Sequence, residues 1–280
     1  MKKRYEDVGG RKFSPGAFVR TIILAASVCL VFISAWMIIS NVLEERRQIE
    51  LRDKVLEHYT AAVAKSEEIA AVVTPTPEAS VTPEIITPIP APTVNPVFTE
   101  LIAEYNNDDI VGFLSIEGTS INYPVVQAVD NDFYLDHDIY KKKSAPGWIF
   151  LDYENDITRN DPNTIIYGHN MKSDTMFHAL RLYADESFYR NHKYITFNTL
   201  YEDLRWEIFS FCKTDTSFDY IRVFFPDMEI YETMLRKFKD LSIYDTEVEI
   251  TGSDRILSLS TCTLGNPNAR FVLSARLLQD

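Results

Sequence analysis

The stretch RILSLSTCTLGNPNARFVLSARL, residues 255–277, has the pattern of a β-hairpin. Its first half alternates Ile and Leu with Ser and Thr and predicts a strand that ends at Cys262, and residues 271–277 predict the return strand. Gly, Pro and two Asn at 265–268 are typical of the loop between them. We therefore expect Cys262 and Arg270 at opposite mouths of one hairpin. A nearby positive charge favours the thiolate form of cysteine, which is the nucleophile.

A candidate base lies upstream, in the segment TIIYGHN at 164–170. This β-branched run ends in His169, where the strand gives way to a loop. A lone Cys or His at a strand end is more often a packing residue than a catalytic one. Together, Cys262, His169 and Arg270 make a nucleophile, a proton carrier and a clamp for a carbonyl or oxyanion.

Several segments of the chain resemble the class B sortases, which are membrane-anchored cysteine transpeptidases. These segments are, in chain order, INYPVVQ, TIIYGHNM, TMFHAL, SFYRNHKYI and LSLSTC. The resemblance covers about residues 108–280. It implies an eight-stranded β-barrel, with Cys262 as nucleophile, His169 as proton carrier and Arg270 as the group that steadies the substrate or the oxyanion.

The same resemblance implies substrate contacts from six more residues, for each of which a loop or packing role is an equal alternative. They are Asn131, Leu135, Thr216, Tyr220, Ile221 and Ser260. The chain departs from the familiar class B pattern at Thr263, where a carboxylate normally follows the nucleophile. The recognised sorting signal therefore stays open between an NPxTN-like motif and an SPxTG- or NPxTG-like motif.

The chain also contains an uncharged apolar run of 23 residues, Thr21–Leu43. A helix of this length spans roughly 34 Å, enough for a hydrocarbon core of about 30 Å, so we expect one transmembrane helix. Six Lys and Arg precede it within residues 1–20, which predicts a cytoplasmic N-terminus and a catalytic domain outside the cell membrane. A cleaved signal peptide is the alternative, but the run is too long for one and no small-x-small site follows it.

Two segments follow the apolar run. Residues 44–71 have helix-forming composition with apolar residues at seven-residue spacing, which predicts a helical stalk. Residues 72–97 hold seven of the thirteen prolines and predict an extended spacer that keeps the next domain away from the membrane. We expect the catalytic domain at residues 98–280.

Residues 98–280 are expected to be mainly β. A helix is expected at 98–105, a second at 175–183, and a third at 227–241 with Asp227 as its N-cap. The last has the position of the extra helix that the resemblance implies for class B. Strands are expected at 110–116, 121–126, 147–151, 164–167, 193–198, 207–214, 247–251, 255–261 and 271–277. Short strands at this spacing favour a closed or nearly closed antiparallel barrel, which removes exposed sheet edges.

Composition limits the possible partners. The chain has 28 Lys and Arg against 41 Asp and Glu, a net charge of −13, and residues 98–280 carry the whole excess. Nucleic-acid binding needs a basic face, so we expect no such partner. The three cysteines suggest no disulfide framework, although a Cys212–Cys262 bond stays open as an alternative. No side chains have metal-ligand spacing, so we expect neither metal nor cofactor.

The function implied by the resemblance is cleavage of a C-terminal sorting signal after Thr through a thioacyl enzyme. The cut protein then passes to an amine of a cell-wall precursor or of another protein, such as a pilin. Two other functions stay open: a membrane-tethered cysteine protease and a catalytically silent barrel that binds peptides. The acceptor amine, wall anchoring against pilus assembly, and the oligomeric state also stay open.

Overall fold

The computed structural model describes residues 15–72, 93–171, 173–215, 217–263 and 266–279. The chain divides into two compact units, residues 1–47 and 48–280. Helix α1 (Pro15–Val72) contributes to both. In the first unit its large apolar side chains are exposed. Within the described ranges this is the one helix long and apolar enough to cross a membrane.

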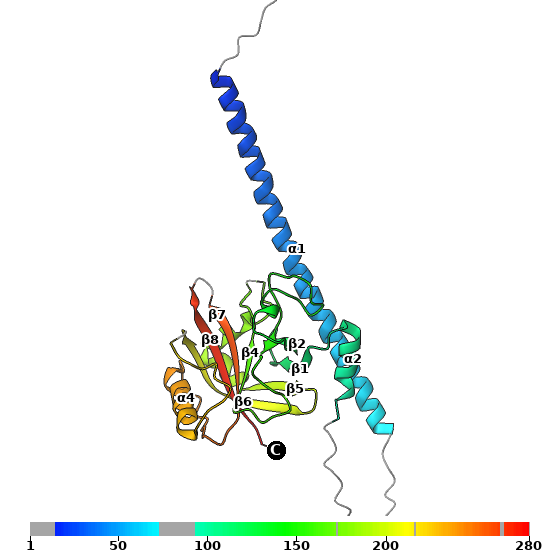
Figure 1. Cartoon of the computed structure of the whole chain (residues 1–280), viewed down its shortest axis with the longest axis vertical. Coiled ribbons are helices and arrows are strands. Elements are labelled where there is room, and N and C mark those ends of the chain that lie inside the picture. Colours follow the sequence, from blue (N-terminus) through cyan, green and yellow to red (C-terminus); the bar gives the residue numbers. More distant parts are fainter. Residues whose placement is uncertain (1–14, 73–92, 172, 216, 264–265, 280) are drawn as a thin grey trace, which may run out of the picture. The chain divides into compact units, whose positions relative to one another are not determined.

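The second unit is built on a closed barrel of eight strands (Figure 1). The strands are β1 (Ile110–Ser115), β2 (Asn122–Val126), β3 (Phe150–Leu151), β4 (Asn163–Tyr167), β5 (Tyr194–Thr199), β6 (Asp203–Thr214), β7 (Ile256–Thr263) and β8 (Asn266–Leu277). Their order around the barrel is β1-β2-β3-β4-β7-β8-β6-β5, and β5 pairs with β1. Closure leaves no free sheet edge. The predicted mainly β, closed eight-stranded barrel is confirmed.

Two neighbouring pairs of strands are parallel, β2 with β3 and β4 with β7. The expectation of an antiparallel barrel is wrong at these two places. Parallel partners are joined by long connections, and the local residue pattern of a strand does not contain the direction of a partner reached that way. Because β4 and β7 are parallel, their carboxyl ends lie at the same end of the barrel.

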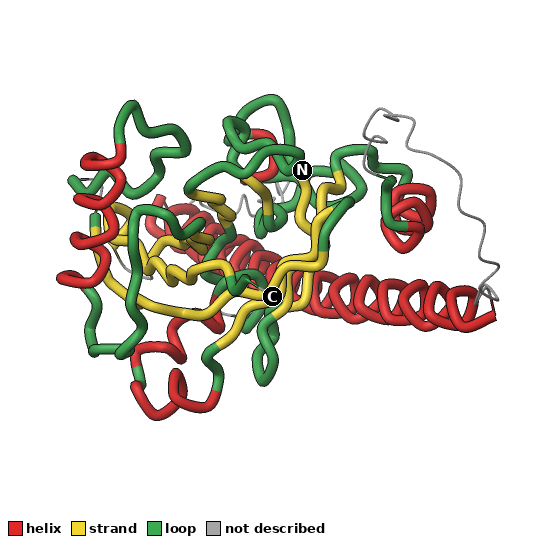
Figure 2. Tube along the Cα trace, turned by 90° about the horizontal axis from the view of Figure 1, so that it is seen from below, coloured by secondary structure: helices red, strands yellow, loops and turns green. Residues whose placement is uncertain are grey.

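The helices of the second unit follow the sequence in part. Helix α2 (Pro96–Tyr105) and helix α4 (Met228–Leu241) are confirmed, and the Asp227 side chain accepts a hydrogen bond from the Ile230 backbone N–H at 2.9 Å. Helix α4 packs against β6 and lies outside the strands, as do the long loops in Figure 2. The remaining helices are η1 (Phe133–Leu135), η2 (His178–Ala184) and α3 (Glu186–Asn191).

Two expected elements are absent from the described residues because residues with positive φ angles interrupt them. The α-helix expected at 175–183 is the 3₁₀ helix η2 instead, because Asp174 and Met176 have positive φ angles that an α-helix cannot contain. The strand expected at 247–251 makes no ladder, and Glu247 has a φ of 61°. A residue pattern with the right period does not reveal such interruptions.

Residues 48–62 of α1 pack one face against the core of the second unit. Leu51 and Val55 are buried in the same apolar cluster as the barrel. The Tyr59 ring stacks on Phe113 of β1 with centroids 3.7 Å apart, and Gln48 Nε2 donates to Ser144 Oγ at 2.7 Å. Much of the expected stalk is therefore part of the folded domain.

Residues 73–92 of the expected proline-rich spacer lie outside the described residues. The flanks of that segment both belong to the second unit, since Lys65 Nζ pairs with Glu100 Oε1 at 2.5 Å. The segment thus connects two helices of one unit.

Removing α1 from the second unit is expected to destabilise it. A fragment of residues 98–280 would expose the surface that Leu51 and Val55 cover, and burial of two such side chains stabilises by about 3 kcal/mol or more. We expect a fragment of residues 48–280 to unfold at a clearly higher urea concentration than residues 98–280. In the longer fragment, Val55→Asp should reproduce the loss and Glu57→Gln, at an exposed position, should not. Equal midpoints for the two fragments would show that α1 adds nothing to the fold.

Candidate active site

Strands β4 and β7 bring His169 close to Cys262. Tyr167 is in register with Ser260, and the Gly168 N–H donates to the Ser260 carbonyl at 3.2 Å. His169 and Cys262 each follow that pair by two residues. Adjacent strands lie about 4.8 Å apart, so the two backbones leave the barrel side by side.

Strand β8 brings Arg270 to the other side of Cys262. In the antiparallel pair of β7 and β8, Cys262 is the register partner of Arg270. Arg270 is partly buried, and its Nη1 donates to the Ala269 carbonyl at 3.2 Å. The side chain of Cys262 lies outside the described residues. The backbone order across this end of the barrel is therefore His169, Cys262, Arg270.

A pocket of about 250 Å³ opens at this end of the barrel. Four of the residues named from the sequence as catalytic or substrate-binding line it together with His169: Asn131, Leu135, Ser260 and Arg270. The other lining residues are Phe150, Tyr167, Gly168 and Thr261. The pocket thus combines aromatic walls with polar groups at the strand ends, which is typical of a site for a small ligand or a peptide segment.

The orientation of the His169 ring is fixed by a backbone carbonyl. Nε2 of His169 lies 2.9 Å from the carbonyl oxygen of Leu135, at the end of η1. A carbonyl only accepts hydrogen bonds, so Nε2 carries the hydrogen and donates it. In the neutral ring Nδ1 then holds the lone pair. The Phe177 N–H also donates to the His169 carbonyl at 2.9 Å, which holds the backbone.

Leu135 is itself held in place by a glycine. Gly147 has a φ of 57°, and a Cβ added there would lie 2.6 Å from the Leu135 carbonyl oxygen and 2.3 Å from that of Tyr134. Only a residue without a side chain fits this close approach. Gly147 therefore allows the Leu135 carbonyl oxygen to lie within hydrogen-bond distance of His169 Nε2.

Ser260 and Tyr220 form a buried pair behind the pocket. Their hydroxyl oxygens are 2.8 Å apart, and both residues are almost fully buried. Asn163 Nδ2 donates to the Tyr220 carbonyl at 2.9 Å, which ties this segment to β4. Ile221 is 46% exposed and is not among the lining residues, and Thr216 lies outside the described residues. The structure thus brings together four of the six expected substrate contacts, with Tyr220 reaching the site through Ser260.

Comparison with known proteins gives the family. The family model of the sortase domain matches residues 114–278, more than half of the chain. The chain belongs to the sortase family. Sortase B of Listeria monocytogenes is 44% identical over 174 residues, which are 61% of this chain and 71% of that protein. Sortase B of Staphylococcus aureus is 31% identical over 261 residues, which are 92% of this chain and 96% of that protein.

The fold comparison supports the same class. A solved structure described as a Staphylococcus aureus sortase B–substrate complex has a TM-score of 0.71 and 31% identity, covering 85% of this chain and 99% of that one. This protein is thus a class B sortase, and as such a transpeptidase of the cysteine class. Its apolar N-terminal helix fits a membrane-anchored enzyme.

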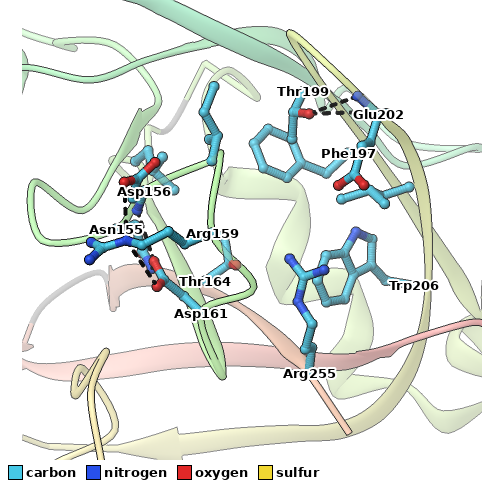
Figure 3. Close-up of a pocket in the computed structure, with 13 residues that line it drawn as sticks. Asn155, Asp156, Arg159, Asp161, Thr164, Phe197, Thr199, Glu202, Trp206 and Arg255 are labelled. Atoms are coloured by element: carbon cyan, nitrogen blue, oxygen red, sulfur yellow. Dashed lines mark hydrogen bonds and ion pairs between the residues drawn. The ribbon is translucent and has the colours of Figure 1, made fainter. Parts of the chain in front are cut away.

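Another of the pockets in the described part of the chain lies at the opposite end of the barrel, and Figure 3 shows the residues that line it. It lies at the starts of β4 and β7, where Thr164 and Arg255 line it. Its volume is about 10 Å³, the space that one water molecule needs. Arg159 pairs there with Asp156 at 3.0 Å, and no Cys or His is among its lining residues. The pocket beside His169, where Cys262 and Arg270 are also brought by the strand register, is the candidate active site.

Cys212 of this sortase is a free, buried thiol. Burial raises its pKa to about 12, so it stays protonated and unreactive at neutral pH. The alternative of a Cys212–Cys262 disulfide is wrong, because Cys212 is a free thiol and β8 lies between its strand, β6, and the strand of Cys262, β7. Among the described residues no group of three or more His, Cys, Asp or Glu side chains could hold a metal ion.

The sequence analysis did not single out three residues of this site. Tyr167 is the last residue of β4 and precedes Gly168 and His169, and its place at the strand end beside the candidate base was a usable signal. Phe150 and Asp152 come from β3 and the turn after it, and neither carries a local pattern. Only the fold brings them next to β4.

Proposed function

We propose that this sortase cleaves a C-terminal sorting signal after Thr, with Cys262 as nucleophile, and transfers the new carboxyl end to an amine. The observation that carries the proposal is the register that sets His169 and Arg270 on either side of Cys262 at one peptide-sized pocket. A thiolate needs a cation and a proton carrier on its two sides, and this order supplies both.

The proposed steps follow from the donors and acceptors. The Cys262 thiol first passes its proton to Nδ1 of His169, and the resulting thiolate attacks the Thr carbonyl carbon while Arg270 stabilises the charge that develops on the carbonyl oxygen. The carbon–nitrogen bond then breaks, and His169 gives its Nδ1 proton to the leaving amine. An incoming amine attacks the thioester, passes a proton back to Nδ1 and releases the thiolate. The Nε2–H bond to Leu135 keeps Nδ1 as the exchanging atom throughout.

The substrate contacts belong to the same proposal. Asn131, Leu135 and Ser260 line the pocket, Tyr220 supports Ser260, and Thr216 and Ile221 are assigned by the family resemblance. A class B relative of known structure was solved as a substrate complex, which supports a peptide ligand for this pocket. We also propose that the N-terminus is cytoplasmic and the catalytic domain extracellular, on the basic residues before the apolar run.

The test is the fate of the acyl group. The full chain in detergent micelles is given peptides with NPxTN-, NPxTG- and SPxTG-like signals, with and without a short glycine or diaminopimelate-type peptide. We expect one class of signal to be cut after Thr, and the amine to give a new amide product and to speed turnover, as followed by mass spectrometry. Efficient cleavage that yields only the free acid would favour a tethered protease. Saturable binding with no cleavage would favour a silent barrel.

A further inference from the structure

Asp152 is a buried carboxylate that lies behind the wall of the active-site pocket and contacts two of its lining residues, Asn131 and Tyr167. It is 3% exposed, and none of the ion pairs among the described residues includes it. Burial of a carboxylate without a cation is costly unless hydrogen bonds satisfy its oxygens. The hydrogen bonds of Asp152 therefore decide what this buried carboxylate does beside the pocket.

The donors to Asp152 include two residues that line the pocket. Its Oδ2 accepts from Asn131 Nδ2 at 2.9 Å and from the Tyr167 hydroxyl at 2.8 Å. Its Oδ1 accepts from the Glu154 backbone N–H at 2.9 Å. The carboxylate is thus held by one loop, by β4 and by its own turn. Burial, reinforced by the charge of Asp152, raises the pKa of Tyr167, so the hydroxyl keeps its proton and stays a donor.

The hydrogen bonds to Asp152 determine which donors and acceptors of Asn131 and Tyr167 are available to a ligand. Asn131 Oδ1 accepts from the Tyr153 backbone N–H at 3.0 Å, so the amide of Asn131 cannot be reversed without losing two hydrogen bonds. Its NH₂ group has two hydrogens, and Asp152 accepts one. Tyr167 gives its only hydrogen to Asp152 and keeps lone pairs. One side chain therefore has a donor left, and the other has an acceptor.

We propose that Asp152 is a positioning residue that sets the hydrogen-bond polarity of the pocket wall for a peptide backbone. A peptide group has one N–H and one C=O, which match the acceptor of Tyr167 and the donor of Asn131. The proposal rests on the proposed function, because the ligand is the backbone of the sorting signal. It assigns to Asp152 no contact with the substrate.

The first test is Asp152→Asn in the full chain. An amide at this position has one oxygen and one NH₂ group. Its single oxygen cannot replace both Oδ2, which accepts from Asn131 and Tyr167, and Oδ1, which accepts from the Glu154 N–H. We expect kcat/KM for the cleaved signal peptide to fall about 10- to 100-fold, the range for lost hydrogen bonds to a charged group, and mostly through KM. Glu154→Gln removes the same charge from an exposed neighbour and should leave both constants unchanged.

A charge swap separates this role from a purely structural one. In Asn131→Asp two carboxylates face each other, which should lower the melting temperature. In Asn131→Asp with Asp152→Asn the bond between the two positions re-forms with its donor and acceptor exchanged, so the melting temperature should recover. KM should stay raised, because residue 131 no longer has an N–H for the substrate. Recovery of KM along with stability would overturn the proposal, as would wild-type kinetics in Asp152→Asn.

One readout does not depend on turnover. In the full chain with ¹⁵N-labelled Asn, the Asn131 side-chain amide proton that is bonded to Asp152 should exchange slowly in the wild type and rapidly in Asp152→Asn. Wild-type protein that cuts no signal peptide would refute the proposed function, and the Asn131 exchange rates would still decide whether Asp152 holds the amide. Unchanged exchange in Asp152→Asn would overturn the positioning role even in an active enzyme.

Discussion

Cys262→Ala is expected to abolish both cleavage and amide formation, with a rate loss of about 10³-fold or more. The reason is that the thioacyl intermediate needs a thiol, and Cys212 is too deeply buried to replace Cys262. His169→Ala should cause a loss of similar size, because the leaving amine would then depart without a proton. The measurement is product formation from the signal peptide, with the melting temperature recorded for each variant.

Cys212→Ala is the matched control for this prediction. It removes a thiol of the same chain from the core, where the pKa of Cys212 is raised to about 12 by burial. Some stability should be lost because a small cavity forms, but turnover below the melting temperature should stay at the wild-type level. If Cys262→Ala still cleaves the signal peptide and Cys212→Ala does not, the nucleophile is assigned to the wrong cysteine.

Gly147→Ala is expected to have the second-largest effect. Alanine at a φ of 57° costs about 1–2 kcal/mol, and its Cβ would stand 2.6 Å from the Leu135 carbonyl oxygen. The backbone of η1 must then move, and that carbonyl is the acceptor for His169 Nε2. We expect a lower melting temperature together with a fall in kcat of about tenfold or more, measured well below the transition.

Gly118→Ala separates backbone strain from the effect on His169. Gly118 also has a positive φ, 75°, but its added Cβ would meet the His192 side chain and not the backbone of η1. This variant should lose stability and keep its kcat. If Gly147→Ala and Gly118→Ala lose stability equally and both keep kcat, the Leu135 carbonyl does not control His169.

The sequence predicted most of this fold because much of the barrel is encoded locally. Residues 255–277 contain both strands of their hairpin, and Asp227 begins α4 as expected. The parallel partners of β3 and β7 were not predictable, since they depend on which distant strands meet. The burial of Val55 was missed for the same reason: a heptad pattern shows that a helix has an apolar face, but not what covers it.

The candidate site shows the same division. Cys262 and His169 stand at or just after strand ends, and Arg270 lies in β8 opposite Cys262. Their residue types suggest chemistry, so the sequence could name them. Asp152 could not be assigned, because in the sequence it is one acid in the run LDYEND, close to Glu154 and Asp156. Its role depends on its being buried against Asn131 and Tyr167, and burial of a polar group is decided by tertiary packing.

The order of strands in the barrel bears on how the chain folds. β8 is the last of the eight strands to be synthesised, yet it lies between β7 and β6. β7 in turn pairs with β4, from which many residues separate it in the sequence. Contacts between distant segments form slowly, and the barrel cannot close before β8 is available. The backbones of His169 and Arg270 come to lie on either side of Cys262 only after that closure, so under the proposed function the nucleophile becomes active in the last step of folding.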